Sequence, residues 1–353
     1  MHYTGTIWRP PYEADSLLLE VTAGCTHHRC KFCTLYSDLP FKFRMSPMED
    51  IESDLLEVQV LRHNPTSMMT AKLQGLPRPK PIKRVFLTGA NPFVLTTGKL
   101  LEIAALIRKY LPSVETIGCF ARITDSVNKT DEDLILLRQA GYNGLTTGVE
   151  TGDDTSLSFM QKGYTSQDIL TQCKRLEQAK IEYGFFYLTS ISGKGKGETG
   201  AKASADVFNQ LHPFLIGPNM LTIYPESKLY QEIQNGNWEE ESEIEKYREL
   251  RTLVENINIS TYFAAMGASN AFQLRGRLPE DKEQLLETLD RIISEIREAQ
   301  PLSLCYLFPA FISDFDTVVG STNFSGALSS KLQKLCKYGR TCSCISVRSA
   351  IYA

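Results

Sequence analysis

Three cysteines lie within nine positions of the chain, at Cys25, Cys30 and Cys33. Thiolates favour soft metal centres, so one short loop that carries three of them can bind zinc or an iron–sulfur cluster. A structural zinc ion usually has a fourth protein ligand, and a fully coordinated cluster has a fourth cysteine. His27 and His28 lie too near along the chain to supply that ligand. The spacing therefore predicts a three-cysteine site with one coordination position open to another molecule.

The remaining six cysteines do not repeat this spacing. An odd total of nine in a chain of 353 residues argues against a disulfide framework. Three of them stand alone in apolar or helical contexts, which is typical of small buried side chains: Cys119, Cys173 and Cys305. The role of the last three is left open, because no strand or helix pattern frames them: Cys336, Cys342 and Cys344. The metal chemistry is therefore expected at residues 25–33.

The elements around the cysteines alternate regularly. Residues 16–22 form an apolar run that predicts a buried strand, which ends directly before Cys25. Further strands are expected at 84–88, 114–123, 144–150, 182–191 and 214–224, and helices at 46–64, 98–110, 131–141, 166–180 and 199–211. The first helix is expected to open with a capping box from Ser46 to Glu49. About six strand–helix units therefore predict an α/β fold with a parallel sheet, either open or partly closed into a barrel.

This alternation ends near residue 235, so we assign residues 1–235 to one core barrel. Residues 236–300 contain two charged amphipathic segments, at about 239–257 and 280–298, which predict a small helical cap or flank. Residues 301–353 show no clear period and form a C-terminal tail of unassigned structure. The glycine-rich stretch 192–200 lacks the GK[ST] ending of a P-loop, so we interpret it as a mobile loop at the barrel mouth.

Composition narrows the class of protein. With 42% hydrophobic and 22% charged residues, the chain can bury a large core. The net charge of -3, without a run of basic residues, does not indicate a nucleic-acid partner. The first residues lack a signal-peptide pattern, and no apolar run approaches about 18 residues, so we expect neither secretion nor a membrane span. The expected location is the cytoplasm.

The cysteine stretch resembles that of the radical S-adenosylmethionine (radical SAM) superfamily. In that family three closely spaced cysteines follow the first strand of a parallel barrel, with an aromatic residue, here Phe32, just before the last cysteine. Two later blocks agree, LTGANP at 87–92 and GVETG at 148–152. The second is similar to a block of the branch with oxygen-independent coproporphyrinogen oxidases, tRNA methylthiotransferases and the Elongator catalytic subunit. This chain departs from the commonest pattern by one extra residue between Cys25 and Cys30.

The resemblance implies a fold, cofactors and ligands. The fold would be a partial (β/α)6 TIM-like barrel with a small C-terminal helical region. The three cysteines would hold a [4Fe–4S] cluster by three irons, with SAM on the fourth. The backbone of Gly89 and Ala90 would meet the SAM amino group, Glu150 would reach its ribose, and Lys162 would pair with its carboxylate. Three more residues are candidates for the same pocket: Phe32, Arg122 and Ser126.

The resemblance also implies an enzyme. The reduced cluster would cleave SAM to a 5′-deoxyadenosyl radical, which abstracts hydrogen from an unidentified substrate, expected to be a small molecule. An electron donor such as flavodoxin or ferredoxin is implied. Two alternatives stay open: a radical SAM enzyme that modifies RNA, and a non-catalytic iron–sulfur electron-transfer or zinc-binding protein. A SAM pocket around Gly89, Ala90 and Glu150 would argue against the non-catalytic alternative, in which these residues have no use.

Overall fold

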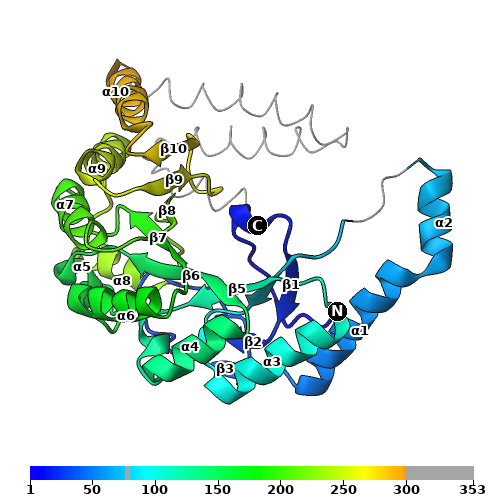
Figure 1. Ribbon diagram of the computed structural model, residues 1–353. Helices are drawn as coiled ribbons and strands as arrows, with labels where there is room; N and C mark the ends of the chain where they lie inside the picture. The colour runs from blue at the N-terminus through cyan, green and yellow to red at the C-terminus, as the bar shows by residue number, and fades with distance from the viewer. Residues whose placement is uncertain (76–79, 299–353) are drawn as a thin grey trace, which may run out of the picture.

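The computed structural model describes residues 1–75 and 80–298, and an eight-stranded sheet lies at its centre (Figure 1). In spatial order the strands are β1 (Leu17–Glu20), β4 (Arg84–Thr88), β5 (Thr116–Ala121), β6 (Tyr142–Glu150), β7 (Tyr183–Thr189), β8 (Leu215–Met220), β9 (Thr261–Ala265) and β10 (Leu274–Leu278). Neighbouring strands are parallel except β9 and β10, which are antiparallel. In the described part of the chain β1 and β10 do not pair, so the sheet curves but stays open. The predicted α/β fold with a partial barrel is confirmed.

Helices cover the outer face of the curved sheet (Figure 1). The longer ones are α1 (Met48–His63), α3 (Thr97–Tyr110), α4 (Asp131–Gln139), α6 (Ser166–Gln178), α7 (Gly197–Phe208), α9 (Glu243–Asn256) and α10 (Lys282–Glu298). Shorter helices and 3₁₀ turns are α2 (Pro65–Leu73), α5 (Asp154–Phe159), α8 (Lys228–Gln234), η1 (Pro11–Glu13), η2 (Pro92–Val94) and η3 (Ile123–Ser126). Among the described helices, none is long and apolar enough to cross a membrane.

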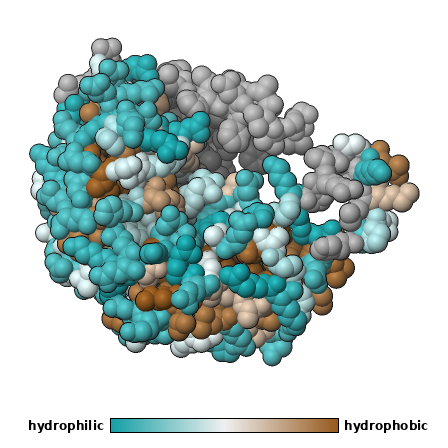
Figure 2. Space-filling view, in the orientation of Figure 1, coloured by the Kyte–Doolittle hydropathy of each residue, from teal (hydrophilic) through white to brown (hydrophobic). Residues whose placement is uncertain are grey.

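The hydrophobic core lies between the sheet and these helices. Alternate strand residues such as Val85, Leu87 and Cys119 face the helices and are fully buried. Burial of a large apolar side chain stabilises the fold by about 1.5–3 kcal/mol. Cys173 on α6 belongs to the same core, so it and Cys119 are the small buried side chains that the sequence predicts. Figure 2 shows a largely hydrophilic surface, with apolar side chains gathered over the lower part, where α3 and α4 lie.

Local sequence sets the start of several helices. Capping boxes open α4, α6 and α9, with Thr130, Thr165 and Ser242 as the capping residues. Each such cap contributes about 0.5–2 kcal/mol. The capping box expected at Ser46 is wrong, because α1 begins at Met48 with Pro47 as its N-cap and no side-chain cap bond. The Ser46 amide instead donates to the Val21 carbonyl, which keeps this residue with the preceding strand.

The amino ends of the strands are closed by a group of residues that we name the amino-terminal plug: Tyr12, Glu13, Ser16 and Arg84. The Arg84 side chain lies over Gly118 and Gly144, whose missing Cβ atoms leave room for its guanidinium. Arg84 Nε and Nη2 donate to the buried Glu13 carboxylate at 2.7–3.0 Å. The Tyr12 hydroxyl bonds to Thr146 on the inner face of β6, and the Tyr12 ring packs edge-on against Phe214. The protein itself therefore fills this edge of the sheet beside β4, β5 and β6.

The region after residue 235 differs from the sequence expectation. The two predicted helices are present as α9 and α10, but between them β9 and β10 extend the central sheet. The expected mobile loop at 192–200 is only partly a loop, because α7 begins at Gly197, whose amide donates to Glu241 Oε1 at 3.1 Å. The division of the chain at residue 235 stays a prediction. Residues 301–353, with Cys305, Cys336, Cys342 and Cys344, lie outside the described residues.

Candidate active site

The three cysteines lie on a loop that a small antiparallel ladder closes at its base. We name residues 25–42 the cysteine loop; it connects β2 (Thr22–Gly24) to β3 (Phe43–Met45). The Cys25 amide donates to the Lys42 carbonyl at 2.9 Å. Gly24 has a φ of +80°, and a Cβ there would lie 2.2 Å from the Lys42 carbonyl oxygen, so only glycine fits. The ladder fixes the position at which the loop leaves the carboxyl end of β1.

All three thiols of the cysteine loop are free; Cys25 and Cys30 are half-buried and Cys33 is exposed. Burial raises the pKa of Cys30, while the positive charges of Lys162 and Arg122 act in the opposite direction. Burial also raises the pKa of Cys33, to about 12, because many protein atoms surround its sulfur even though the residue reaches the surface. In the part of the chain that the structure describes, no three His, Cys, Asp or Glu side chains are arranged to hold one metal ion.

The donor chemistry of the loop fits an iron–sulfur cluster. A cluster spreads three thiolates over three irons, whereas one zinc ion needs every ligand about 2.0–2.3 Å from a single point. Thiolates are the soft ligands that iron–sulfur centres prefer. Lys162 and Arg122 place positive charge beside Cys30, which offsets part of the rise that burial causes in its pKa. Three donors on one loop also leave one iron of a four-iron cluster for another ligand.

A buried ion pair stands at the carboxyl end of β6, next to the cysteine loop. Lys162 is 4% exposed, and its Nζ donates to Glu150 Oε1 and to the Gly148 carbonyl, both at 3.1 Å. A Cβ on Gly148 would lie 2.5 Å from Glu150 Oε1, so the glycine makes room for the carboxylate. Burial lowers the pKa of Lys162, but the attraction of Glu150, Tyr164 and Cys30 together outweighs it and the net shift is upward. Lys162 therefore carries a positive charge at neutral pH.

The predicted turn at Gly89 and Ala90 follows β4 and packs against β2. Gly89 has a φ of +117°, and a Cβ there would lie 2.1 Å from Thr22 Oγ1. The glycine is thus already required by contact with the chain itself, independently of any ligand. Thr22 Oγ1 and Thr88 Oγ1 are both buried without a hydrogen-bond partner among the described residues. Two buried hydroxyl groups without partners in the described residues therefore lie beside the turn, one on β2 and one on β4.

The other predicted residues divide into two groups. Phe32 and Arg122 lie near the ion pair: the Phe32 ring centre is 5.6 Å from Lys162 Nζ, and Arg122 Nη2 donates to the Lys162 carbonyl at 2.6 Å. Ser126 is buried against α6 instead, where its hydroxyl donates to Gln172 Oε1 at 3.1 Å. The structure thus brings the first two to the Glu150–Lys162 pair and engages the hydroxyl of Ser126 with a helix.

Sequence reasoning missed Asn91, which joins three loops at this edge. Asn91 is fully buried, and its Nδ2 donates to Thr26 Oγ1 at 2.9 Å and to Asp125 Oδ1 at 3.0 Å. Burial raises the pKa of Asp125 to about 6, and the bonds it accepts, from the Arg122 amide and from Asn91, act in the opposite direction. Asn91 directly follows Ala90, so the same stretch that predicted the turn contained the signal for it.

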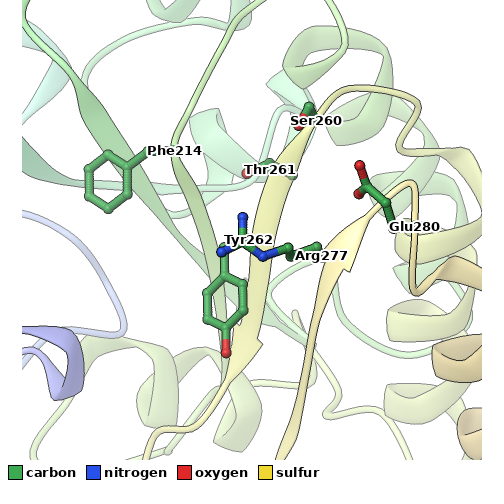
Figure 3. Close-up of a pocket in the computed structure, with 6 residues that line it drawn as sticks. All are labelled: Phe214, Ser260, Thr261, Tyr262, Arg277 and Glu280. Carbon is green, nitrogen blue, oxygen red and sulfur yellow. The ribbon is translucent and has the colours of Figure 1, made fainter.

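A small pocket of about 170 Å³ lies away from this site (Figure 3). Its lining comes from the start of β9, the end of β10 and the residues beside them: Phe214, Ser260, Thr261, Tyr262, Arg277 and Glu280. Tyr262 pairs with Leu215 at the start of the parallel strand β8, so the pocket is at the amino edge of the sheet. The cysteine loop and the Glu150–Lys162 pair are at the carboxyl edge, where α/β folds commonly bind ligands.

Comparison with known proteins identifies the family. Residues 19–202 match the sequence model of the radical SAM superfamily. This stretch contains the cysteine loop, the Gly89 turn and the Glu150–Lys162 pair. The chain belongs to the radical SAM superfamily. Members of this superfamily are enzymes that cleave SAM, a chemistry for which they generally use a [4Fe–4S] cluster.

Individual relatives of this radical SAM protein are distant. The heme chaperone HemW of Bacillus subtilis (strain 168) is 26% identical over 101 residues, which is 29% of this chain and 27% of HemW. Among solved structures, methylornithine synthase (PylB) has a TM-score of 0.47 at 15% identity. The match covers 69% of this chain and 63% of the PylB chain. Coproporphyrinogen III oxidase (HemN) from Escherichia coli has a TM-score of 0.49 at 14% identity, over 68% of this chain and 51% of the HemN chain. The chain thus spans about a quarter of HemW and less than two thirds of either enzyme.

Proposed function

We propose that this protein holds a [4Fe–4S] cluster on Cys25, Cys30 and Cys33 and binds SAM at the iron that these thiolates leave free. When bound, the cluster and SAM would supply a reductive cleavage that yields a radical able to take a hydrogen atom from a substrate. Family membership supports SAM cleavage in general. The assignment to these three cysteines rests on their common loop and on the charged groups beside it.

One observation carries the proposal: the ion pair beside the cysteine loop is incomplete. Lys162 uses two of its three Nζ protons, and Glu150 accepts through Oε1 only, within the described residues. A buried ammonium and carboxylate gain more from full hydrogen bonding than exposed ones do. A ligand that carries its own carboxylate and hydroxyl groups, as SAM does, would complete both partners. This supports Lys162 as the partner of the SAM carboxylate and Glu150 as the partner of the ribose.

The remaining residues would shape the pocket. The turn at Gly89 and Ala90 presents backbone without bulky side chains, which suits close approach of the SAM amino group. Phe32 would pack beside the ligand, and Arg122 would hold the Lys162 backbone in place through its 2.6 Å bond. Ser126 would support the pocket indirectly, because its hydrogen bond to Gln172 fixes η3 to α6.

The proposed substrate is a small molecule that enters at the carboxyl edge of the sheet. A net charge of -3 supplies no field that would attract a polyanion such as RNA. The proposed electron source is a small redox protein such as flavodoxin or ferredoxin.

The test is anaerobic reconstitution of the protein with iron and sulfide. The wild-type chain should bind about four irons and four sulfides and give the EPR signal of a reduced [4Fe–4S] cluster, which should change when SAM is added. The protein with all three cysteines changed to alanine should bind neither. Full iron and sulfide content in that triple variant would refute the cluster assignment.

A further inference from the structure

Three successive backbone carbonyls at residues 160–162 accept hydrogen bonds from outside their own segment. The Met160 carbonyl accepts from the Lys31 amide at 3.1 Å, and the Gln161 carbonyl accepts from His27 Nε2 at 2.6 Å. The Lys162 carbonyl accepts from Arg122 Nη2 at 2.6 Å. We name residues 160–162 the carbonyl link. Two of its three partners belong to the cysteine loop.

The backbone of this segment explains why its carbonyls are available. Helix α5 ends at Phe159, so residues 160–162 lie beyond it and their carbonyls take no part in the helix. Gln161 then takes a φ of +56° and Gly163 a φ of +79°, so the chain leaves the helical path. At Gly163 a Cβ would lie 2.8 Å from His27 Cε1, so the glycine leaves space for the imidazole ring. The His27 ring therefore has a fitted position as well as a hydrogen bond.

The carbonyl link also holds the ion pair of the proposed SAM site. The backbone of Lys162 is in the link, while its side chain reaches back to Glu150 and to Gly148 at the end of β6. The same few residues thus contact the cysteine loop through main-chain atoms and β6 through a side chain. A shift of the loop relative to the link would change the distance between the thiols and the ion pair.

The part of the loop between Cys25 and Cys30 depends on His27 for this contact. The second half of the loop has further anchors on α8, because the Leu229 amide donates to the Lys31 carbonyl at 2.8 Å and Lys31 Nζ pairs with Glu232 at 2.7 Å. In the first half, the Thr26 amide is 3.5 Å from Asn91 Oδ1, a long hydrogen bond. Thr26 Oγ1 also accepts from Asn91 Nδ2 at 2.9 Å, and the 2.6 Å bond of His27 is the shortest of the three. This half also contains the extra residue that lengthens the spacing between the first two cysteines.

We propose that His27 is a positioning residue that fixes the cysteine loop on the carbonyl link and so sets the cluster relative to Lys162 and Glu150. The role rests on the proposed function of this site. It requires only an N–H group that donates to the Gln161 carbonyl and a flat group that fits over Gly163. His27 itself contacts no reacting atom in this proposal.

The test uses the full-length chain with His27 changed to Leu, which removes the donor, or to Gln, which retains one. His28→Asn is the matched control, because His28 is an exposed neighbour whose positive φ asparagine tolerates. After reconstitution, His27→Leu should keep its iron but bind SAM about tenfold more weakly, since one hydrogen bond is worth about that factor at most. The SAM-induced change in its EPR signal should shrink. His27→Gln and His28→Asn should stay within about threefold of wild type.

Amide hydrogen exchange on the cofactor-free proteins provides a readout that needs neither cluster nor SAM. Exchange in residues 25–31 should be faster in His27→Leu than in wild type or His28→Asn. Unchanged SAM affinity, EPR response and exchange in His27→Leu would overturn the proposal. Loss of iron from both His27 variants, with His28→Asn intact, would also overturn it, because His27 would then retain the cluster rather than align it. Failure of the proposed function would show itself separately, as a wild-type protein without cluster or SAM response.

Discussion

The two edges of the central sheet each hold a buried ion pair, and the two pairs differ in completeness. At the amino edge, all five N–H groups of Arg84 donate, to Glu13, to Thr116 Oγ1 and to two carbonyls of residues 143–144. The Glu13 carboxylate accepts from Arg84 and from Ser16. At the carboxyl edge, Lys162 and Glu150 each keep hydrogen-bonding capacity in the described structure. A complete pair supports the fold, whereas an incomplete pair can bind a ligand.

The residues of the two ion pairs also differ in backbone conformation. The carboxyl edge contains Glu150 and Ser190 with positive φ, a conformation that costs about 1–3 kcal/mol for residues other than glycine. It also contains buried hydroxyls of Thr22 and Thr88 without partners among the described residues. Unfavourable backbone conformations and unpaired buried groups are common in functional sites. The residues that fill the amino edge, Tyr12 to Ser16 and Arg84, have no positive φ.

The largest expected effect is on stability at the amino edge. Changing Arg84 to Ala leaves the Glu13 carboxylate buried without its cation, which should lower the free energy of unfolding by about 3–5 kcal/mol. Urea unfolding followed by circular dichroism measures this. The matched control is Lys83→Ala, whose exposed pair with Glu115 should cost at most about 1 kcal/mol. A loss in Arg84→Ala no larger than in the control would contradict the account of the plug.

The next effect is on ligand binding at the carboxyl edge. Lys162→Met keeps the aliphatic stem and removes the charge, so the reconstituted protein should retain iron but bind SAM about 10- to 100-fold more weakly, because hydrogen bonds to charged groups are worth about 1.5–3 kcal/mol. Anaerobic calorimetry gives the affinity. Lys194→Met, at an exposed pair with Glu239, is the control and should bind SAM normally. Equal SAM affinity in the two variants would remove Lys162 from the site.

A smaller effect on stability is expected for Glu241→Gln, which should stabilise the protein where Arg84→Ala destabilises it. The Glu241 carboxyl group is buried beside that of Glu249, and burial together with this neighbour raises the pKa of Glu241 above its usual value of 4.5. The folded state therefore holds a proton that the unfolded state releases, so this group's contribution to stability is full below about pH 4.5 and falls as the pH rises through the higher pKa of the folded state. Glu241→Gln, which is neutral at every pH, should melt about 2–4 °C higher than wild type near pH 9 and almost equally at pH 4.5. A lower melting temperature at pH 9 would show that the charge is stabilising.

The sequence predicted the main architecture because its signals are local. Apolar runs marked the parallel strands, and their alternation with helical segments predicted helices such as α4 and α6. The strands β9 and β10 were missed although Leu274, Gly276 and Leu278 alternate with exposed arginines. They are short, form an antiparallel pair at the sheet edge and lie between two strongly amphipathic helices, whose signal dominated the interpretation.

The candidate site was predicted where its residues are adjacent in a motif and missed where contacts are distant in sequence. Glu150 and Lys162 were named from one motif, and the structure pairs them with each other, while their contacts to SAM stay a prediction. The bond from His27 to the Gln161 carbonyl spans 134 positions and depends on the positive φ of Gln161, which no sequence pattern indicates. Ser126 was named as a site residue, but nothing in the sequence indicated that its hydroxyl would donate to Gln172 on α6.

The most direct test of the central claim is the product formed from SAM at the carboxyl edge. Wild-type protein with a filled cluster, reduced by dithionite without oxygen, should slowly release 5′-deoxyadenosine and methionine even without its substrate. Cys30→Ala should release neither, because the cluster is lost, whereas Lys83→Ala at the opposite edge should match wild type. Chromatography that finds S-adenosylhomocysteine and no 5′-deoxyadenosine, from protein with a full complement of iron and sulfide, would contradict the account.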